Sequence, residues 1–178
     1  VQLVVVDYRR SLLGEVPDEY LLNYLTSATQ ATPTLKDIAS YLEGRIPGPD
    51  VTPDQLRSRS WWTGAEVFVV VDDYDMVVTS TGNPMLPIVE LASHARDIGL
   101  HIVLARRSGG LGRAMFDPLI ARLKDLSSDI LLMSGDRDEG FITGRSRMQT
   151  VTSPTELFLA LAMRRMFSAT GTVMSTTS

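Results

Sequence analysis

Short apolar runs alternate with amphipathic stretches along most of this chain. Four of the runs are rich in Val, Ile and Leu, which is typical of strands buried on both faces of a sheet. We therefore expect neighbouring core strands at 2–7, 67–72, 100–105 and 129–133.

Between these runs, apolar residues recur every three or four positions, the spacing of a helix with one buried face. Prolines and acids at the starts of these segments, and glycines at their ends, are typical of helix termini. We expect helices at 17–28, 32–44, from Pro53, from Pro87 to Gly99, and from Pro118 to about Leu126. A capping box formed by Ser153 and Glu156 predicts one more helix, followed by a disordered end.

Strands separated by helices favour right-handed crossovers, and therefore an α/β fold whose mostly parallel sheet carries helices on both faces. In such sheets ligands bind at the carboxyl ends of the strands. All four expected strands end there in polar residues: Asp7-Tyr8-Arg9-Arg10, Asp72-Asp73, Arg106-Arg107-Ser108 and Ser134-Gly135-Asp136. This edge of the sheet is the candidate functional site.

Composition limits the classes of protein that the chain can belong to. Its 178 residues, 44% hydrophobic and 21% charged, predict one domain with a sizeable core. No run approaches the roughly 18 apolar residues that cross a bilayer, and no leader opens the chain, so we expect membrane attachment only through other segments or subunits. The absence of cysteine excludes disulfides and thiolate chemistry, and the net charge of −4 disfavours nucleic acid as a partner.

A pair of carboxylates, Asp72 and Asp73, follows directly after the apolar run 67–71, with Asp75 close behind. A nucleotide hydrolase needs such a pair beside a phosphate-bound magnesium ion. The first acid binds a metal-coordinated water, and the second orients the attacking water. The competing interpretation is a solvent-exposed strand end that carries acids without a catalytic role.

A phosphate loop of the form GxxxxGKS/T is absent from the 178 residues. The glycine-rich SGGLGRAM at 108–115 lacks the lysine and follows the third expected strand, so we interpret it as a flexible loop. His94 and His101 lack metal-ligand spacing, and no serine lies in a GxSxG elbow. Trp61 and Trp62 precede a central strand, where packing is a better interpretation than stacking on bases.

Four segments follow one another in an order and spacing that is specific when taken together. They are LVVVDYRR, SWWTGAEVFVVVDDYDMV, LASHARDIGLHIVLARRS and FDPLIARLKDLSSDILLMSGDRDEG. With them the chain resembles the FtsK/SpoIIIE branch of P-loop ATPases from Val1 to about Gly144. More narrowly, it resembles a late, C-terminal ATPase module of EccC, the motor protein of type VII (ESX) secretion systems.

The resemblance implies a RecA-like P-loop NTPase core at 1–150. The phosphate-loop strand and helix would be missing from it, because in this family they come just before the position of Val1. Residues 151–178 would form a C-terminal helix and a disordered tail, for which the family gives no counterpart.

The resemblance also implies ATP and magnesium as ligands. Asp72 would hold the magnesium through a water molecule, and Asp73 would stand at the catalytic position. Arg106, Arg107 and Asp136 would contact the nucleotide.

Three departures from the family pattern favour a degenerate module. Asp73 stands where active members carry glutamate; its carboxylate is about 1.5 Å shorter in reach, and a misplacement near 1 Å can cost about 100-fold in rate. ARRS at 105–108 replaces a TQRP-like sensor, and beyond Gly144 the PGRG-like turn is missing.

The function that the resemblance implies is a degenerate ATPase module of a type VII secretion motor. It would couple nucleotide binding to assembly and to the recognition of exported substrates. Its partners would be neighbouring ATPase modules, in a homo-hexamer of the parent, and small helical-hairpin substrates recognised through a C-terminal signal. It would act in the cytoplasm, at the inner face of the plasma membrane.

Hydrolysis of ATP is expected for the complete parent domain, whereas this chain, which has no phosphate loop, should be inactive alone. Two alternatives stay open: a DNA-translocating motor domain of the same superfamily, and a non-catalytic interaction domain with the same fold.

Overall fold

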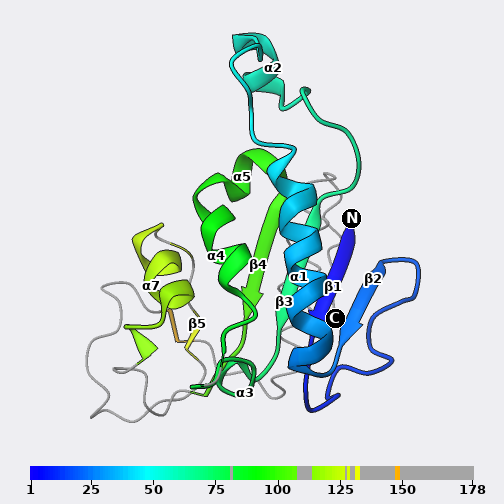
Figure 1. Ribbon diagram of the computed structural model, residues 1–178, viewed down its shortest axis with the longest axis vertical. Helices are drawn as coiled ribbons and strands as arrows, with labels where there is room; N and C mark the ends of the chain where they lie inside the picture. Colours follow the sequence, from blue (N-terminus) through cyan, green and yellow to red (C-terminus); the bar gives the residue numbers. More distant parts are fainter. Residues whose placement is uncertain (81, 108–113, 127, 129–130, 133–146, 149–178) are drawn as a thin grey trace, which may run out of the picture.

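The computed structural model describes residues 1–80, 82–107, 114–126, 128, 131–132 and 147–148. A parallel four-stranded sheet in the order β2–β1–β3–β4 lies at its centre. The strands are β1 (Gln2–Val6), β2 (Leu21–Leu25), β3 (Val67–Val71) and β4 (Leu100–Leu104). Their carboxyl ends lie at the bottom of Figure 1. The α/β class is confirmed, as is the parallel pairing expected for three of the four core strands.

The strands β1 and β3 are buried on both faces, which explains their unbroken apolar sequences. Along β1, Val4 and Val6 contribute to one core cluster, whereas Leu3 and Val5 contribute to a second cluster on the opposite face. β3 repeats this alternation, and all five of its residues are buried.

Most helices of the described part pack on the first cluster, whereas α2 (Pro53–Ser58) has no buried residue. The longest, α1 (Ala28–Glu43), lies in front of the sheet in Figure 1 and buries one stripe of residues. That stripe is Ala31, Leu35, Ile38, Ala39 and Leu42. The others are α2 (Pro53–Ser58), α3 (Tyr74–Val77), α4 (Leu86–Leu91), η1 (Ala92–His94), α5 (Ala95–Ile98) and α7 (Pro118–Asp125). The second cluster is closed by the 8–20 segment, which contributes Leu12, Val16 and Tyr20. Within the described ranges, no helix has the length and apolar character needed to span a membrane.

The helix expected at 17–28 is wrong. Pro17 and Asp18 lie in a turn, where the Pro17 carbonyl accepts from the Tyr20 amide, and β2 follows directly. β2 pairs with the free edge of β1, and this pairing satisfies backbone groups that an isolated helix would satisfy internally. A proline followed by acids fits a turn as well as a helix start, so tertiary pairing decides.

Two other helices differ from their expected forms. α1 starts at Ala28, several residues before the expected start, and therefore carries Pro33 inside it. The helix expected from Pro87 to Gly99 is divided into α4, a 3₁₀ turn η1 and α5. Its end at Gly99 is confirmed, because that residue adopts the left-handed conformation of a C-terminal cap, with φ of +69°.

The fourth expected strand is described only at its centre. β5 (Leu131–Leu132) pairs in parallel with β6 (Arg147–Met148), and β4 pairs with β3 alone in the described part. The helix expected from Ser153 and the tail after it lie outside the described residues.

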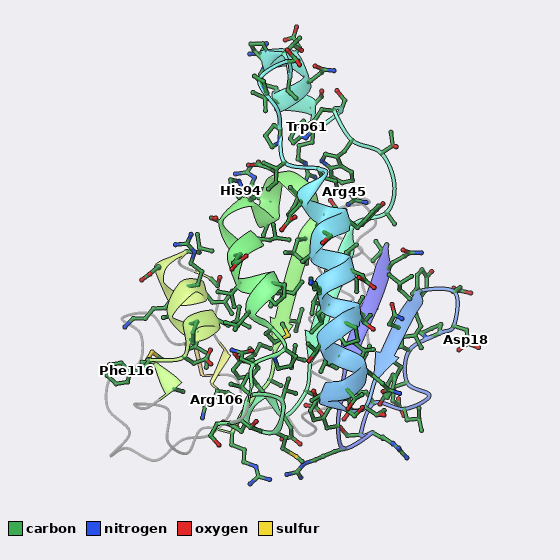
Figure 2. All side chains as sticks on the ribbon, in the orientation of Figure 1. Asp18, Arg45, Trp61, His94, Arg106 and Phe116 are labelled. Carbon is green, nitrogen blue, oxygen red and sulfur yellow. The ribbon has the colours of Figure 1, made fainter. Side chains whose placement is uncertain are left out.

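The segment 48–65, which we call the arm, projects from the amino-terminal end of the sheet and carries α2 at the top of Figure 1. Its base is fixed by Arg45, which is only 4% exposed. The Arg45 guanidinium lies between the rings of Trp62 and Tyr41, at 4.2 and 4.8 Å from their centroids. Trp61 donates its ring N–H to the Arg45 carbonyl at 2.7 Å, and Figure 2 shows the two residues together.

Candidate functional site

The polar ends of β1, β3 and β4 meet at one edge because the strands are parallel and in register. The Asp72 amide donates to the Val6 carbonyl at 3.0 Å, and the Ala105 amide donates to the Val71 carbonyl at 2.9 Å. The ladder thus continues one residue beyond each strand. It brings Asp7 beside Asp72, although the two are far apart in sequence.

Asp7 is completely buried and shapes the loop that follows β1. Its Oδ1 accepts from the backbone amides of Arg9 (3.0 Å) and Arg10 (2.7 Å). Its Oδ2 accepts from the Leu12 amide (2.8 Å) and from the Tyr24 hydroxyl (2.5 Å). A carboxylate with several such donors is well compensated for burial. We call residues 8–12, which wrap around it, the acceptor loop.

The acceptor loop contacts both members of the predicted acid pair. The Ser11 hydroxyl donates to Asp72 Oδ2. Arg9 Nε lies 2.7 Å from Asp73 Oδ2 and also 2.9 Å from the sulfur of Met76. The structure therefore places Asp72 and Asp73 together at the end of β3, each with its own partner.

Asp73 has an unusual backbone conformation, with φ of +45° and ψ of +54°. This left-handed conformation is uncommon for a residue other than glycine, although aspartate tolerates it better than most. Asp73 immediately precedes α3 but makes no side-chain cap to that helix. Its carboxylate is thus turned toward Arg9 instead of toward the helix amides.

The third acid, Asp75, is directed to the end of β4. Its Oδ1 lies 2.8 Å from a terminal guanidinium nitrogen of Arg106, and its Oδ2 accepts from the Arg107 amide at 3.1 Å. Arg106 lies at the opposite end of the sheet from Arg45 (Figure 2). In the described part, the Arg106 side chain and the Arg107 amide therefore contact Asp75. Asp136, the other predicted nucleotide contact, lies outside the described residues.

Two tyrosine hydroxyls attach flanking elements to this edge. Tyr24 of β2 donates to Asp7, and Tyr74 of α3 donates to Asp117 Oδ1 at 2.8 Å. Asp117 also caps α7 by accepting from the Leu119 and Ile120 amides. Burial, followed by the hydrogen bond to a carboxylate, raises the pKa of both Tyr24 and Tyr74 above the ordinary tyrosine value.

A cavity of about 400 Å³ lies between the residue that follows Asp7, the start of α1 and the end of α3. Tyr8, the first two turns of α1, Met76 and Val77 line it, together with residues 79 and 82–84, whereas neither Asp72 nor Asp73 does. The Tyr8 hydroxyl is buried without a hydrogen-bond partner in the described part, and burial raises its pKa. The cavity therefore borders Met76, whose sulfur also accepts from Arg9 Nε.

The donor set fits a magnesium ion that is bound mainly by phosphate and water. Magnesium favours hard oxygen ligands, keeps several waters, and uses one or two carboxylates beside substrate phosphates. Asp72 and Asp73 supply two such carboxylates on a rigid strand end. Among the described residues no group of three or more His, Cys, Asp or Glu could hold a metal by itself.

The sequence identified the acid pair but gave no roles to Asp7, Arg9, Ser11 or Tyr24. A usable signal was present, since β1 ends in the same way as β3, with an apolar run followed at once by charged residues. The contact between the two strand ends depends on the strand order, which the sequence pattern does not supply.

The fold and the polar strand ends define a class of protein: an α/β domain with the RecA-like P-loop fold. Two solved structures match 84% of this chain, each with a TM-score of 0.78 and 50% identity. One is the cytoplasmic domain of the Thermomonospora curvata type VII secretion ATPase EccC, of which the chain covers 17%. The other is EccC from the same organism, ATPases 2 and 3, in complex with a signal sequence peptide, of which it covers 27%.

Sequence comparison with curated proteins also finds similarity to EccC. The chain is 52% identical over 143 residues to the ESX secretion system protein EccC of Thermomonospora curvata, and 49% identical over 146 residues to EccC4 of the Mycobacterium tuberculosis ESX-4 system. These matches cover 80% and 82% of this chain but only 11% and 12% of the relatives, so the chain spans about a tenth of their length. No family model matches. The resemblance to an EccC ATPase module is therefore confirmed: in sequence and fold the chain is related to a segment of EccC.

Proposed function

We propose that this chain is part of a degenerate ATPase module in a type VII protein secretion motor. In this proposal the module binds Mg-ATP at the carboxyl ends of β3 and β4. Nucleotide binding supports assembly with neighbouring modules and the recognition of exported substrates.

One observation carries the proposal: Asp72 and Asp73 end a fully buried central strand in a chain half identical to solved EccC ATPase structures. On a rigid strand, Asp72 would hold the magnesium through a water molecule and Asp73 would orient the attacking water. Magnesium, when bound, neutralises charge on the phosphates. The Ser11 hydroxyl supports this arrangement because it fixes one oxygen of Asp72 and leaves the other available.

The phosphate loop would come from the segment that precedes Val1 in a longer parent chain. The outer edge of β4 offers a place for such a segment, since β4 pairs only with β3 in the described part. His101, Ile102, Val103 and Leu104 are only partly buried there, unlike the fully buried β3. A further parallel strand on this edge would release its carboxyl-terminal loop at the same end as Asp72 and Asp73.

The proposed partners follow from the solved relatives. A similar EccC structure was captured with a signal sequence peptide, which supports recognition of exported substrates through a short terminal signal. The same structure contains two ATPase modules, which supports neighbouring modules as further partners. A homo-hexamer of the parent remains part of the proposal. The other solved EccC structure is a cytoplasmic domain, which supports a cytoplasmic place for this module. In our proposal the module lies at the inner face of the plasma membrane.

Calorimetric titration with ATP, with and without magnesium, tests the nucleotide site. The 178-residue chain should bind very weakly, because carboxylates repel phosphates where no phosphate-loop amides and lysine compensate them. A longer chain that includes the preceding segment should bind Mg-ATP. In it, Asp72→Asn should weaken binding only when magnesium is present. Asp73→Asn should leave binding nearly intact but remove residual hydrolysis.

Asp37→Asn is the matched control, because it removes the same charge from the exposed face of α1. Equally tight ATP binding by the short chain, or indifference of the longer chain to Asp72→Asn, would contradict the proposal. The acids would then be a solvated strand end in a non-catalytic interaction domain.

A further inference from the structure

We propose that Arg9 holds the Asp73 carboxylate in a resting position and must release it before hydrolysis. This inference rests on the proposed function, since it concerns the acid assigned to the catalytic position. Arg9 would be a positioning residue that regulates Asp73.

The ion pair is the first observation. Arg9 Nε lies 2.7 Å from Asp73 Oδ2, an ion-pair distance, while its N–H donates to the Met76 sulfur at 2.9 Å; the Arg9 and Asp73 side chains are 45% and 24% exposed. An exposed pair of this kind contributes little to the stability of a fold. Stability therefore does not explain why the arginine lies on this carboxylate.

The backbone of Asp73 is the second observation. Aspartate immediately before a helix normally turns its carboxylate to the first helix amides. Asp73 instead adopts φ of +45° and makes no cap, even though α3 begins at the next residue. A sparsely populated backbone conformation at a reactive strand end is typical of a group that changes position during function.

The rigidity of the acceptor loop is the third observation. The backbone amides of Arg9, Arg10 and Leu12 all donate to the buried Asp7 carboxylate. The main chain that carries Arg9 is thus fixed, whereas the Arg9 side chain is almost half exposed and can change its rotamer. A fixed base with a mobile guanidinium allows the contact to open without unfolding the loop.

The chemical consequence follows from the geometry. A carboxylate orients an attacking water by accepting its proton in a hydrogen bond. The Arg9 cation lies against Asp73 Oδ2 and competes with that water for the oxygen. An incoming triphosphate is the natural competitor for Arg9, because guanidinium pairs strongly with phosphate oxygens. Nucleotide binding would thereby free Asp73.

The ion pair itself is tested first, without nucleotide, on the 178-residue chain. Proton–nitrogen spectra of the arginine Nε groups should contain one signal that is absent in Arg9→Lys. That signal should exchange with water more slowly than the Arg10 signal, and Asp73→Asn should shift it. Asp75→Asn, which removes the nearby acid that pairs with Arg106, should leave it in place. The Arg9 N–H also contacts the Met76 sulfur, so the response to Asp73→Asn decides: an Arg9 signal that ignores this change would overturn the proposal, whatever its exchange rate.

Hydrolysis by the longer chain is tested next. Arg9→Gln should raise kcat about two- to fivefold, the factor expected for releasing one partly exposed ion pair, while the KM for Mg-ATP changes little. Arg9→Lys, which keeps the charge, should retain the resting rate. Arg10→Gln removes an exposed charge from the neighbouring position and should have no effect. On an Asp73→Asn background, Arg9→Gln should also have no effect.

A kcat that stays the same or falls in Arg9→Gln, in a chain shown by calorimetry to bind Mg-ATP, would overturn the role of Arg9 and leave the proposed function intact. A longer chain that does not bind Mg-ATP would contradict the proposed function itself. Calorimetry on the wild-type longer chain therefore separates the two failures.

Discussion

Asp7 is a buried carboxylate whose charge is met by hydrogen bonds and, in the described part, by no ion pair. Three backbone amides, the Tyr24 phenol and, at 3.4 Å, the Ser11 hydroxyl donate to it, and its two oxygens divide these donors between them. Such an arrangement ties the position of the carboxylate to the surrounding backbone. Asp7 is therefore the residue on which the acceptor loop, and through it the contacts to Asp72 and Asp73, depends.

Asp7→Asn should lower the free energy of unfolding by about 2–3 kcal/mol. The side-chain NH₂ of the asparagine would face the backbone N–H of Leu12, which would leave a buried donor unsatisfied. Chemical denaturation at neutral pH measures the loss. Asp18→Asn, in an exposed turn, is the control and should change stability by less than about 0.5 kcal/mol. A loss no larger than that of the control would show that the hydrogen bonds to Asp7 do not hold the acceptor loop.

For single residues, the sequence predicts the position of Asp72 and Asp73 better than the identity of the side chains that contact them. Asp72 and Asp73 follow an uninterrupted apolar strand, so their position at a sheet edge is a local property of the chain. Arg9 and Ser11 reach them from the loop that follows β1, and which strand lies beside β3 is a tertiary property. Arg106 and the Arg107 amide contact Asp75, which turns toward β4, and their assignment to the nucleotide stays a prediction.

At the scale of elements, β1, β3 and β4 were predictable because full burial leaves only apolar residues in a short strand. β2 was not, since its residues are partly exposed and its start resembles a helix terminus. The strand forms because it pairs with β1 and because Tyr24 reaches Asp7. Local propensity is a weak guide where an edge strand gains most of its stability from one neighbour.

The arm depends on a close approach that only glycine permits. Gly99 ends α5 with φ of +69°, and a Cβ there would lie 2.7 Å from the Trp62 ring. Gly99→Ala should therefore destabilise the protein by about 2–4 kcal/mol, through backbone strain and displacement of Trp62 from Arg45. Denaturant unfolding measures the loss. Tryptophan emission should shift to longer wavelength, since Trp61 and Trp62 are the two tryptophans of the chain.

Gly48→Ala is the matched control within the arm. Nothing lies within 4 Å of a Cβ at this position, and its φ lies outside the positive range. The change should be neutral or stabilising by up to about 1 kcal/mol. Similar losses in the two variants would show that the packing of Trp62 against Gly99 does not fix the arm.

At the scale of the molecule, Tyr24 and Tyr74 connect opposite flanks to the central strands. Tyr24 attaches β2 to the end of β1, and Tyr74 connects α3 to the cap of α7. Each phenol must stay protonated to donate to its carboxylate. The folded state therefore binds these two protons more tightly than the unfolded state, in agreement with the raised pKa of both groups.

The raised pKa values of Tyr24 and Tyr74 make the stability of the fold fall at high pH. The contribution of the two tyrosines is fully present below the pKa of an unfolded tyrosine, about 10, and is lost as the pH rises above it. Between pH 9 and 11 the wild-type chain should lose about 1–2 kcal/mol more stability than a Tyr24→Phe, Tyr74→Phe double variant, a value reduced by the partial exposure of Tyr24. Denaturant unfolding across this range measures both slopes, and the offset at pH 7 gives the cost of the missing hydroxyls. Parallel curves would contradict the assignment.

The distances along the chain between the partners at this edge determine the order in which the site can form during synthesis. The bond between Tyr24 and Asp7 joins residues only 17 positions apart, whereas the bond between Ser11 and Asp72 spans 61. Short loops close at lower entropic cost than long ones, so the surroundings of Asp7 can assemble while β3 is still being made. Asp72 and Asp73 are synthesised later than the acceptor loop, so Arg9 and Ser11 are already in place when the two acids reach them. A growing chain consequently never presents Asp72 and Asp73 in their native arrangement before their partners exist.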